Sequence, residues 1–240
     1  MTKNWQERAE LLFKEEGIIK LRNANVLVVG MGGVGSFAAE FLVRAGIGKI
    51  TIVDGDVVDV TNINRQLPAL HSTIGMSKVQ LMAKRLLDIN PELQLTVIAE
   101  FLSPTRAYEI VTQDYEFVVD CIDSITPKLN LIIAAKRQKI KVISNMGAGG
   151  KHLTHMVKIT DISKTDYCPL AKTIRKRLKK EGISSGVKVV YSYERPDETS
   201  LKMTDGTNFK KSFYGTNSWM PALFGLYAAQ YVVTTLLKKL

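Results

Sequence analysis

Three charged residues of this chain have the side-chain types needed to handle phosphate groups. Arg65 and Lys78 are cations, and Asp123 is a carboxylate that follows an apolar run. Arginine and lysine neutralise the charge of a triphosphate, and a carboxylate can hold Mg²⁺, which binds few protein carboxylates together with phosphate oxygens. If the fold brings these three side chains together, the chemistry they support is the transfer of adenylate from ATP.

A glycine-rich stretch, VLVVGMGGVGSFAAEF at 26–41, precedes these residues and contains Gly30, Gly32, Gly33 and Gly35. Between a strand and a helix, such glycines let the backbone approach a phosphate, and the helix N-terminus offers free N–H groups to it. Asp54 ends the next apolar run, a position that suits a ribose hydroxyl. These features predict a nucleotide site, but they fit a nicotinamide dehydrogenase as well as an ATP-using enzyme.

The stretch DGDVVDVTNINRQ at 54–66 favours ATP, because it adds Asp56, Asn62, Arg65 and Gln66 directly after Asp54. Lys78 follows at an expected helix start. A hydride-transfer enzyme has no need of an arginine, a lysine and an acid converging on phosphates, whereas an adenylate-forming enzyme needs all three. Asp56 and Asn62 could instead cap a turn or a helix, and Lys78 could be a solvated surface charge.

Alternating apolar strands and helices must position these residues. Short runs rich in valine and isoleucine predict buried strands at 25–30, 49–54, 93–100, 116–122 and 141–145. Helical patterns lie between them at 36–45, 78–90, 103–113 and 127–139. This alternation predicts an α/β fold with a Rossmann-like, doubly wound and mostly parallel sheet, and it places Asp120 and Asp123 at the carboxyl end of the sheet.

The pattern changes after residue 150. We expect two further strands at 155–163 and 187–194, a polar loop at 194–219 and an apolar helix at 221–237. We interpret the chain as a single adenylating domain, 1–240, with a nucleotide-binding core at 20–150 and a substrate-facing extension at 151–240. The apolar helix is at the short limit for a membrane span, so a helix packed on the core is expected and membrane association is not.

The composition restricts the function classes further. The chain has 240 residues and a net charge of +10, an excess that suggests a polyanionic partner. Its two cysteines, Cys121 and Cys168, form neither a disulfide framework nor a four-cysteine zinc site. The N-terminus is polar and charged rather than a signal peptide, so we expect a cytoplasmic protein.

The motifs GxGGVGS, DxDxVxxTNxNRQ, Lys78 and DxxDS occur in this order over residues 26–145, and together they resemble the ubiquitin-activating-enzyme-like superfamily of adenylyltransferases. The resemblance implies that Asp54 holds ribose, that Arg65 and Lys78 contact phosphates, and that Asp123 coordinates Mg²⁺. Asn62 and Gln66 would support these nucleotide-binding residues. It also implies a homodimer in which Arg8 reaches the phosphates bound by the partner subunit.

Further stretches resemble one branch of that superfamily, the tRNA threonylcarbamoyladenosine dehydratases. They are NMGAGGK at 145–151, the segment 157–180, VVYSYERP at 189–196 and GTNSWMPALFGLYAA at 215–229. The implied reaction passes AMP from ATP to the threonyl carboxylate, after which the ureido group of the modified base closes a ring. Intramolecular attack needs no enzyme nucleophile, so we expect structural roles for both cysteines.

Other functions remain open from the sequence. The first alternative is an adenylyltransferase that activates the C-terminus of a sulfur-carrier protein, although the chain lacks the CxxC pairs usual in that branch. A nucleotide-sensing protein without catalysis and a nicotinamide oxidoreductase are both disfavoured by Arg65, Lys78 and Asp123. A sulfur-relay protein is a further possible partner.

The segment KTIRKRLKK at 172–180 predicts a binding surface for tRNA phosphates, because cations supply most of the sequence-independent affinity for nucleic acid. A solvated helix face is the alternative. The six basic residues are Lys172, Arg175, Lys176, Arg177, Lys179 and Lys180.

Overall fold

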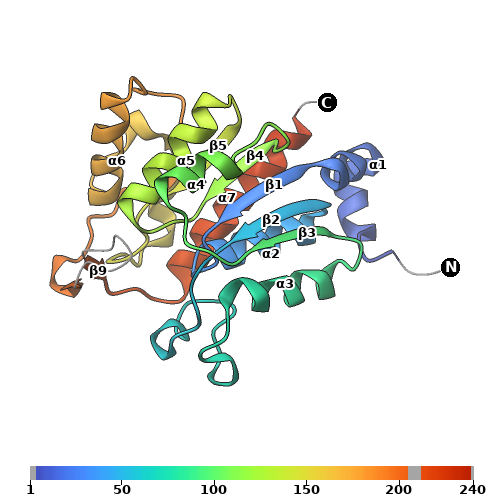
Figure 1. The fold of residues 1–240 in the computed structure, drawn as a ribbon, viewed down its shortest axis with the longest axis horizontal. Coiled ribbons are helices and arrows are strands. Elements are labelled where there is room, and N and C mark those ends of the chain that lie inside the picture. Colours follow the sequence, from blue (N-terminus) through green and yellow to red (C-terminus); the bar gives the residue numbers. More distant parts are fainter. Residues whose placement is uncertain (1–3, 205–211, 239–240) are drawn as a thin grey trace.

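The computed structural model describes residues 4–204 and 212–238, and its centre is a seven-stranded sheet (Figure 1). The strand order is β3-β2-β1-β4-β5-β7-β6, in which β6 is antiparallel to β7 and all other neighbours are parallel. The predicted fold class is therefore confirmed. The strands are β1 (Asn25–Val29), β2 (Lys49–Val53), β3 (Gln94–Ile98), β4 (Phe117–Asp120), β5 (Lys141–Asn145), β6 (Val157–Asp161) and β7 (Lys188–Ser192).

Helices cover both faces of this sheet, because successive side chains of a strand point to opposite sides. Val26 and Val28 of β1 face one core, which also holds residues of α1, α2, α3 and α7, whereas Leu27 and Val29 face a second core with α4, α5 and α6. The helices are α1 (Glu7–Asn23), α2 (Gly35–Ala45), α3 (Lys78–Ile89), α4 (Pro104–Ile110), α5 (Ile125–Arg137), α6 (Pro169–Lys180) and α7 (Trp219–Leu237).

The strand register aligns the carboxyl ends of β1, β2 and β4. Val29, the last residue of β1, pairs with Val53 of β2 and with Asp120 of β4. The residues that follow these three strands therefore emerge at one level of the same sheet edge. This alignment is what allows distant parts of the sequence to build one site.

Helix α7 packs along α2 rather than standing apart from the fold. Gly225 permits the close contact, since a Cβ at this position would lie 2.4 Å from the backbone oxygen of Val34 in the turn before α2. Among the described residues, α7 has the length and apolar composition of a membrane span, but half of its most apolar window is buried within the fold. The expected packing of this helix on the core is therefore found.

Two regions differ from the sequence expectation. Helix α1 was not predicted, and its backbone breaks at Lys14, where φ is 61°. Within the predicted loop 194–219, the short strands β8 (Leu201–Met203) and β9 (Ser212–Tyr214) form a two-stranded hairpin. Residues 205–211 of that loop lie outside the described residues. The side chains of β8 are exposed, so the hairpin lacks the buried alternation by which strands are recognised.

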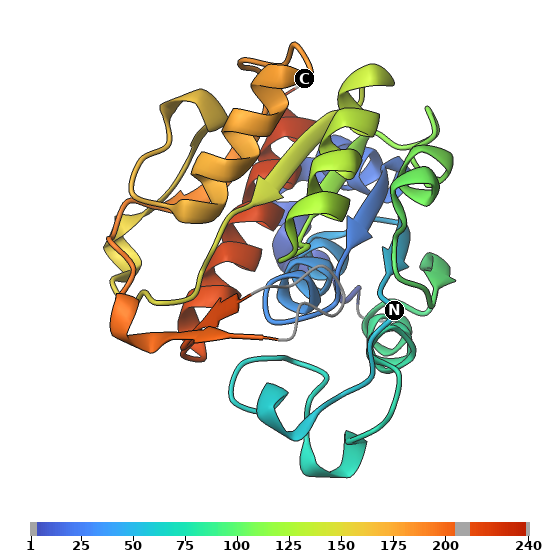
Figure 2. The same ribbon diagram turned by 60° about the vertical axis from the view of Figure 1, so that its left-hand side comes forward.

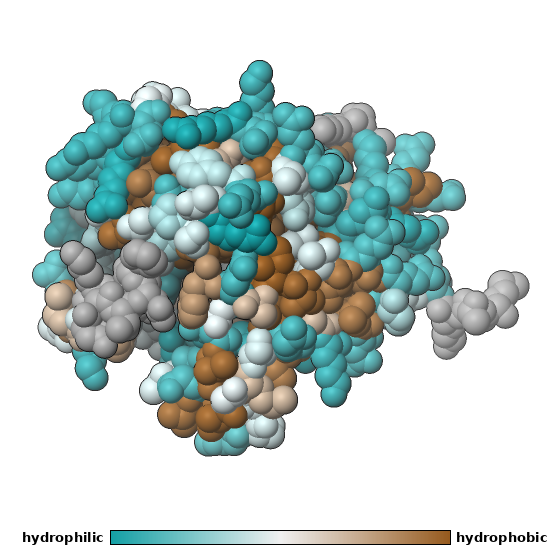
Figure 3. Space-filling view, viewed as in Figure 1, coloured by the Kyte–Doolittle hydropathy of each residue, from teal (hydrophilic) through white to brown (hydrophobic). Residues whose placement is uncertain are grey.

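The segment 55–77, which connects β2 to α3, protrudes beyond the sheet in both ribbon views (Figures 1 and 2). It contains the short 3₁₀ turns Val60–Asn62 and His71–Thr73. Apolar side chains gather on this protrusion in the space-filling view (Figure 3), and the exposed ones are Val57, Val60, Leu70, Ile74 and Met76.

Candidate functional site

The glycine turn lies between β1 and α2. A Cβ at Gly35 would lie 1.6 Å from the backbone oxygen of Gly30, so no other residue fits there. A Cβ at Gly32, by contrast, would meet nothing closer than 3.7 Å, at Nε2 of Gln66. The packing of the protein therefore explains Gly35 but not Gly32. Close approach of a ligand to the backbone is the remaining physical reason for a glycine at 32.

Asp54 is held beside this turn by two backbone amides. Its carboxylate accepts hydrogen bonds from the N–H groups of Met31, at 2.5 Å, and Asp56, at 2.7 Å. Burial raises the pKa of Asp54, although these hydrogen bonds and Lys78 oppose that effect. One carboxylate thus links the glycine turn to the segment after β2.

Lys78 begins α3 and is buried, and its ammonium pairs with a carboxylate. Its Nζ lies 2.9 Å from Oδ2 of Asp56, and its backbone N–H donates to the carbonyl of Asp56. Lys78 is therefore not the solvated surface charge that the sequence also allowed. The pairing gives the buried cation a partner of opposite charge.

Arg65 and Gln66 lie over the glycine turn, and Asn62 lies earlier in the same segment. Asn62 is buried, and its Oδ1 accepts a hydrogen bond from the N–H of Asp59, so it braces the turn as a capping residue. The backbone oxygen of Arg65 would lie 3.2 Å from a Cβ at Gly33, which shows how closely this segment covers the glycines. Oε1 of Gln66 is buried and has no hydrogen-bond partner among the described residues.

A buried ion pair fixes the end of β4. Lys128 and Asp120 are both fully buried, with Nζ of Lys128 at 2.6 Å from Oδ2 of Asp120. Ser144 also donates to this carboxylate, and Asp120 Oδ1 accepts from the N–H of Ile122. Asp120 is therefore structural, and its contact with Ile122 shapes the turn that presents Asp123.

Asp123 is exposed at this turn and interacts electrostatically with Arg65. Burial lowers the pKa of Arg65, and the charge of Asp123 opposes that shift. Arg65 also donates from Nη1 to the carbonyl of Thr61 and to Oδ1 of Asn64, both at 2.9 Å. The interaction joins the segment after β2 to the turn after β4, as the strand register requires.

The structure thus brings the predicted nucleotide residues to one edge of the sheet, with the exception of Arg8. Helix α1 starts at the opposite edge of the sheet. Gln6, which precedes the helix, lies next to Gly46, with its Nε2 at 2.5 Å from where a Cβ of Gly46 would be, and Gly46 lies just before β2 begins. Arg8 is exposed two residues further on. Within one chain it lies away from the glycine turn.

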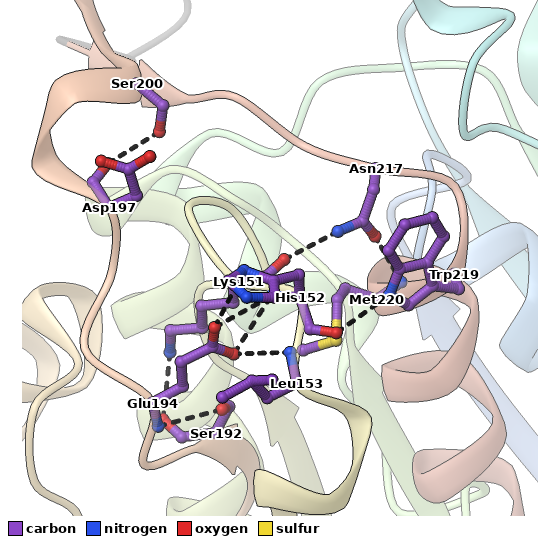
Figure 4. Close-up of polar contacts among 10 residues, drawn as sticks. All are labelled: Lys151, His152, Leu153, Ser192, Glu194, Asp197, Ser200, Asn217, Trp219 and Met220. Carbon is purple, nitrogen blue, oxygen red and sulfur yellow. Dashed lines mark hydrogen bonds and ion pairs between the residues drawn. The ribbon is translucent and has the colours of Figure 1, made fainter.

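The extension adds polar contacts at the same edge, centred on Glu194, which the sequence reasoning missed (Figure 4). The buried carboxylate of Glu194 accepts hydrogen bonds from the N–H groups of His152 and Leu153, and its Oε1 lies 3.2 Å from Nδ1 of His152. Glu194 follows the apolar strand β7, as Asp54 follows β2. An acidic residue at the end of an apolar strand is therefore the sequence pattern that indicates it.

Asn217 and Lys151 complete this contact network. Asn217 donates to the carbonyl of Lys151 at 2.8 Å and caps α7 by accepting from the N–H of Met220 at 2.9 Å (Figure 4). Nζ of Lys151 donates to the carbonyl of Ser192, and burial lowers the pKa of Lys151. The loop after β5 is therefore fixed from two sides, by the end of β7 and by the start of α7.

Helix α6 separates its six basic residues into two groups. Ala171, Ile174 and Leu178 face the core. Arg175 is half-buried, and its Nη1 donates to the carbonyl of Thr165 at 2.7 Å and to the hydroxyl of the same residue. The prediction that Arg175 binds tRNA is weakened, because its guanidinium already braces the fold. The exposed members are Lys172, Lys176, Arg177, Lys179 and Lys180.

The two cysteines have different settings. Burial raises the pKa of Cys121, and the neighbouring charge of Asp120 adds to that effect. Cys168 is buried at the start of α6. Within 4–204 and 212–238, no group of three or more His, Cys, Asp or Glu side chains forms a metal cluster.

One shallow cavity of about 330 Å³ opens at the other edge of the sheet, lined by Asn25, Lys49 and Gln94 among others. These residues begin β1, β2 and β3. Ligands of open parallel sheets bind outside the carboxyl ends of the strands, so this cavity lies at the wrong edge for the nucleotide.

Comparison with known proteins agrees with this arrangement. The model of the ThiF family matches residues 6–239. The chain is 41% identical over 238 residues to the tRNA threonylcarbamoyladenosine dehydratase of Bacillus subtilis, and the match covers 96% of this chain and 94% of that protein.

The fold is also similar to that of a solved enzyme from Escherichia coli, the tRNA N6-threonylcarbamoyladenosine dehydratase in complex with ATP. The TM-score is 0.88 at 36% identity, over 98% of this chain and 96% of that one. A second structure of that enzyme, in complex with AMP, matches equally well, with a TM-score of 0.88. The chain belongs to the ThiF family, in the group that contains these tRNA threonylcarbamoyladenosine dehydratases.

Proposed function

We propose that the chain catalyses the ATP-dependent dehydration of threonylcarbamoyladenosine in tRNA, next to the anticodon. The observation that carries the proposal is the strand register, which brings the segment with Arg65 and Lys78 and the turn with Asp123 to the carboxyl ends of β1, β2 and β4, beside the glycine turn. Similarity over nearly the full length to dehydratases of two bacteria, one of them solved with ATP and with AMP, supports the choice of substrate.

ATP lies along the carboxyl ends of β1, β2 and β4 in this proposal. The glycine turn takes the phosphates, and Asp54 accepts hydrogen bonds from the ribose. Lys78 and Arg65 contact the phosphates, and Asp56 releases Lys78 as they bind. Asn62 keeps its bracing role.

Mg²⁺ is assigned to Asp123. One exposed carboxylate suits this ion, which keeps several waters and takes its other ligands from phosphate oxygens. When bound, the ion supplies positive charge to the triphosphate. Arg65 adds its own positive charge to the same site.

The chemistry proceeds in two steps. An oxygen of the threonyl carboxylate attacks the α-phosphorus of ATP, and pyrophosphate leaves. The ureido group then attacks the activated carbonyl carbon, and the ring closes. AMP leaves with the former carboxylate oxygen, and the attacking group loses a proton. The modified base has then lost one water in total. Both reacting groups belong to one nucleotide, so proximity replaces an enzyme nucleophile. The raised pKa of Cys121 agrees with this route.

The tRNA backbone crosses the exposed side of α6. The helix starts at the site edge, where Sγ of Cys168 would lie 3.8 Å from a Cβ at Gly147, and it ends near the start of β7 at the opposite edge. Its 12 residues span about 18 Å. Lys172, Lys176, Arg177, Lys179 and Lys180 follow this path, which a phosphate backbone can track.

A homodimer completes the site, with Arg8 reaching the phosphates bound by the partner subunit. Exposed apolar side chains support an interface: Leu11 and Leu12 lie near Arg8 on α1, and Val60 and Leu70 lie on segment 55–77 beside the glycine turn. The proposal also includes a single domain of 1–240, a cytoplasmic location and contact with a sulfur-relay protein. It includes no membrane association.

Incubation with ATP, Mg²⁺ and threonylcarbamoyl-modified tRNA, followed by mass analysis of the nucleosides, tests the proposed function. We expect loss of the mass of one water from the modified nucleoside and release of AMP. Consumption of ATP only with a sulfur-carrier protein would establish the alternative adenylyltransferase instead. Calorimetry adds a direct check of the nucleotide, since ATP should bind and NAD should not.

A further inference from the structure

Tyr167 has an unusual backbone for an aromatic residue. Its φ is 50°, a left-handed value that it shares among the described non-glycine residues only with Lys14 and Lys139. Bulky side chains rarely adopt this conformation, and where they do, the surrounding structure must hold them. The side chain is also 53% exposed, so burial of the ring does not explain the strain.

Asp166 holds this turn from two directions. Its backbone carbonyl accepts a hydrogen bond from the N–H of Cys168 at 2.6 Å, and its Oδ1 accepts from the hydroxyl of Tyr191 at 3.1 Å. Tyr191 is fully buried in β7. The strained position of Tyr167 is therefore fixed by the core of the extension and is not a consequence of a loose loop.

A cation covers one face of the exposed ring. Cζ of Arg195 lies 4.8 Å from the centre of the Tyr167 ring, and both residues are exposed. A second pair of the same kind lies nearby, with Nζ of Lys158 at 4.7 Å from the ring centre of Tyr193, two residues before Arg195. The extension thus presents aromatic rings together with positive charge.

Tyr167 and Arg195 lie between the carboxyl end of the sheet, where ATP is proposed to bind, and the basic helix α6. Arg195 directly follows Glu194, which holds the loop after β5, and α6 begins two residues after Tyr167. A path along the exposed lysines of α6 toward the carboxyl end of the sheet leads to the start of this helix, which Tyr167 precedes by two residues.

We propose that Tyr167 and Arg195 form a stacking platform for an unpaired nucleobase of the tRNA anticodon loop, adjacent to the nucleotide that reacts. This inference rests on the proposed function. The base stacks on the open face of the Tyr167 ring, while Arg195 supports the other face and adds positive charge. Flat aromatic faces bind unpaired bases of any identity, so the platform positions the loop without reading its sequence.

The test compares variants of the full-length chain for binding of threonylcarbamoyl-modified tRNA. Tyr167→Asn removes the ring but tolerates a left-handed backbone, so the fold is retained. Tyr167→Phe keeps the ring. The matched control is Tyr108→Ala, which removes an Arg–Tyr pair of similar geometry, with Cζ of Arg137 at 5.4 Å from the Tyr108 ring centre, at the other edge of the sheet.

We expect Tyr167→Asn to weaken tRNA binding by about 5- to 100-fold, the usual range for one lost stacking contact, while Tyr167→Phe and Tyr108→Ala bind as the wild type does. The salt dependence of binding should be unchanged in Tyr167→Asn, because no phosphate contact is lost. Wild-type affinity in Tyr167→Asn would overturn the platform, and so would equal losses in Tyr167→Asn and Tyr108→Ala.

A fluorescent probe gives a second readout that a merely structural role would not change. The probe is an anticodon stem-loop with 2-aminopurine at single unpaired positions of the loop. Stacking on Tyr167 predicts that one position has its fluorescence quenched by the wild type and by Tyr167→Phe but not by Tyr167→Asn. The same quenching by all three proteins would contradict the platform. Failure of the wild type to dehydrate modified tRNA would instead contradict the proposed function, so the two failures are distinguishable.

Discussion

Two parts of the site edge are assembled differently. We call the part around the glycine turn the nucleotide half, and the part built by residues 151–240 the extension half. Around the glycine turn, Asp54 contacts residues 2 and 23 positions away, and Lys78 pairs with a residue 22 positions away, within successive strand–helix units. In the extension, Glu194 holds His152 across 42 positions, and Asn217 holds Lys151 across 66. The carboxylate contacts around the glycine turn thus stay within successive strand–helix units, although Asn64 also donates to the carbonyl of Thr216 across 152 positions. The contacts of Glu194 and Asn217 instead join segments that are distant in the sequence.

This comparison predicts that changes in the nucleotide half have the largest effect on turnover. Asp123→Asn should reduce the rate of dehydration by about 10²–10³, because one preorganised charge at the reacting phosphates is lost. The measurement is the initial rate of AMP release at saturating ATP. Asp114→Asn is the control, since Asp114 is exposed at the opposite edge of the sheet. Equal rates of AMP release in the two variants would show that Asp123 has no role in catalysis.

Changes in the extension should instead affect stability and tRNA while sparing ATP. Glu194→Gln removes the buried carboxylate that accepts from His152 and Leu153, and hydrogen bonds to a charged group contribute about 1.5–3 kcal/mol. We expect a loss of that size in the free energy of unfolding by urea, weaker tRNA binding and unchanged ATP binding. The exposed Glu198→Gln should change none of these. Loss of ATP binding in Glu194→Gln would remove the distinction between the two halves.

Neutralising the exposed side of α6 should change only the electrostatic part of tRNA binding. Each lost phosphate contact lowers the log–log salt slope by about 0.7–0.9, so the joint replacement of Lys172, Lys176, Lys179 and Lys180 by glutamine should lower it by about 3. Filter binding over a range of salt concentrations measures the slope. Arg175→Gln should lower stability through the loss of its contacts to Thr165 and leave the slope unchanged. If the slope of the quadruple variant is that of the wild type, the helix is only a solvated face.

The smallest effect is expected at Cys168. Its thiol is buried at the start of α6, and the proposed ring closure uses no enzyme nucleophile. Cys168→Ser should therefore retain the dehydration rate with purified tRNA and ATP. A folded but inactive Cys168→Ser protein, identified by its circular dichroism spectrum, would point to a covalent mechanism.

The sequence predicted the nucleotide half well because its signals are local. Each of the five strands at 25–145 was found, but β3 is not buried as predicted, because it lies at the edge of the sheet. Helix α2 was expected at 36–45 and observed at Gly35–Ala45. The glycines, Asp54 and Asp123 then follow from where such strands end. Electrostatic interaction between Asp123 and Arg65 is the structural outcome of that regularity.

The extension was predicted less completely because its contacts are not local. Nothing near Glu194 in the sequence indicates that it binds the backbone at 152 and 153, and Arg175 looks like its basic neighbours although it is bonded to Thr165. Helix α1 was missed for a related reason: its break at Lys14 interrupts the apolar periodicity, and only Gly17, Ile18 and Leu21 are buried.

The central claim, adenylation of the threonyl carboxylate, has a direct isotopic test. Modified tRNA whose threonyl carboxylate carries ¹⁸O in both positions is incubated with the wild-type chain, ATP and Mg²⁺, and the products are analysed by mass spectrometry. We predict one ¹⁸O in AMP, none in pyrophosphate, and one retained in the dehydrated nucleoside. Unlabelled AMP, or label found in inorganic phosphate together with ADP, would contradict the account.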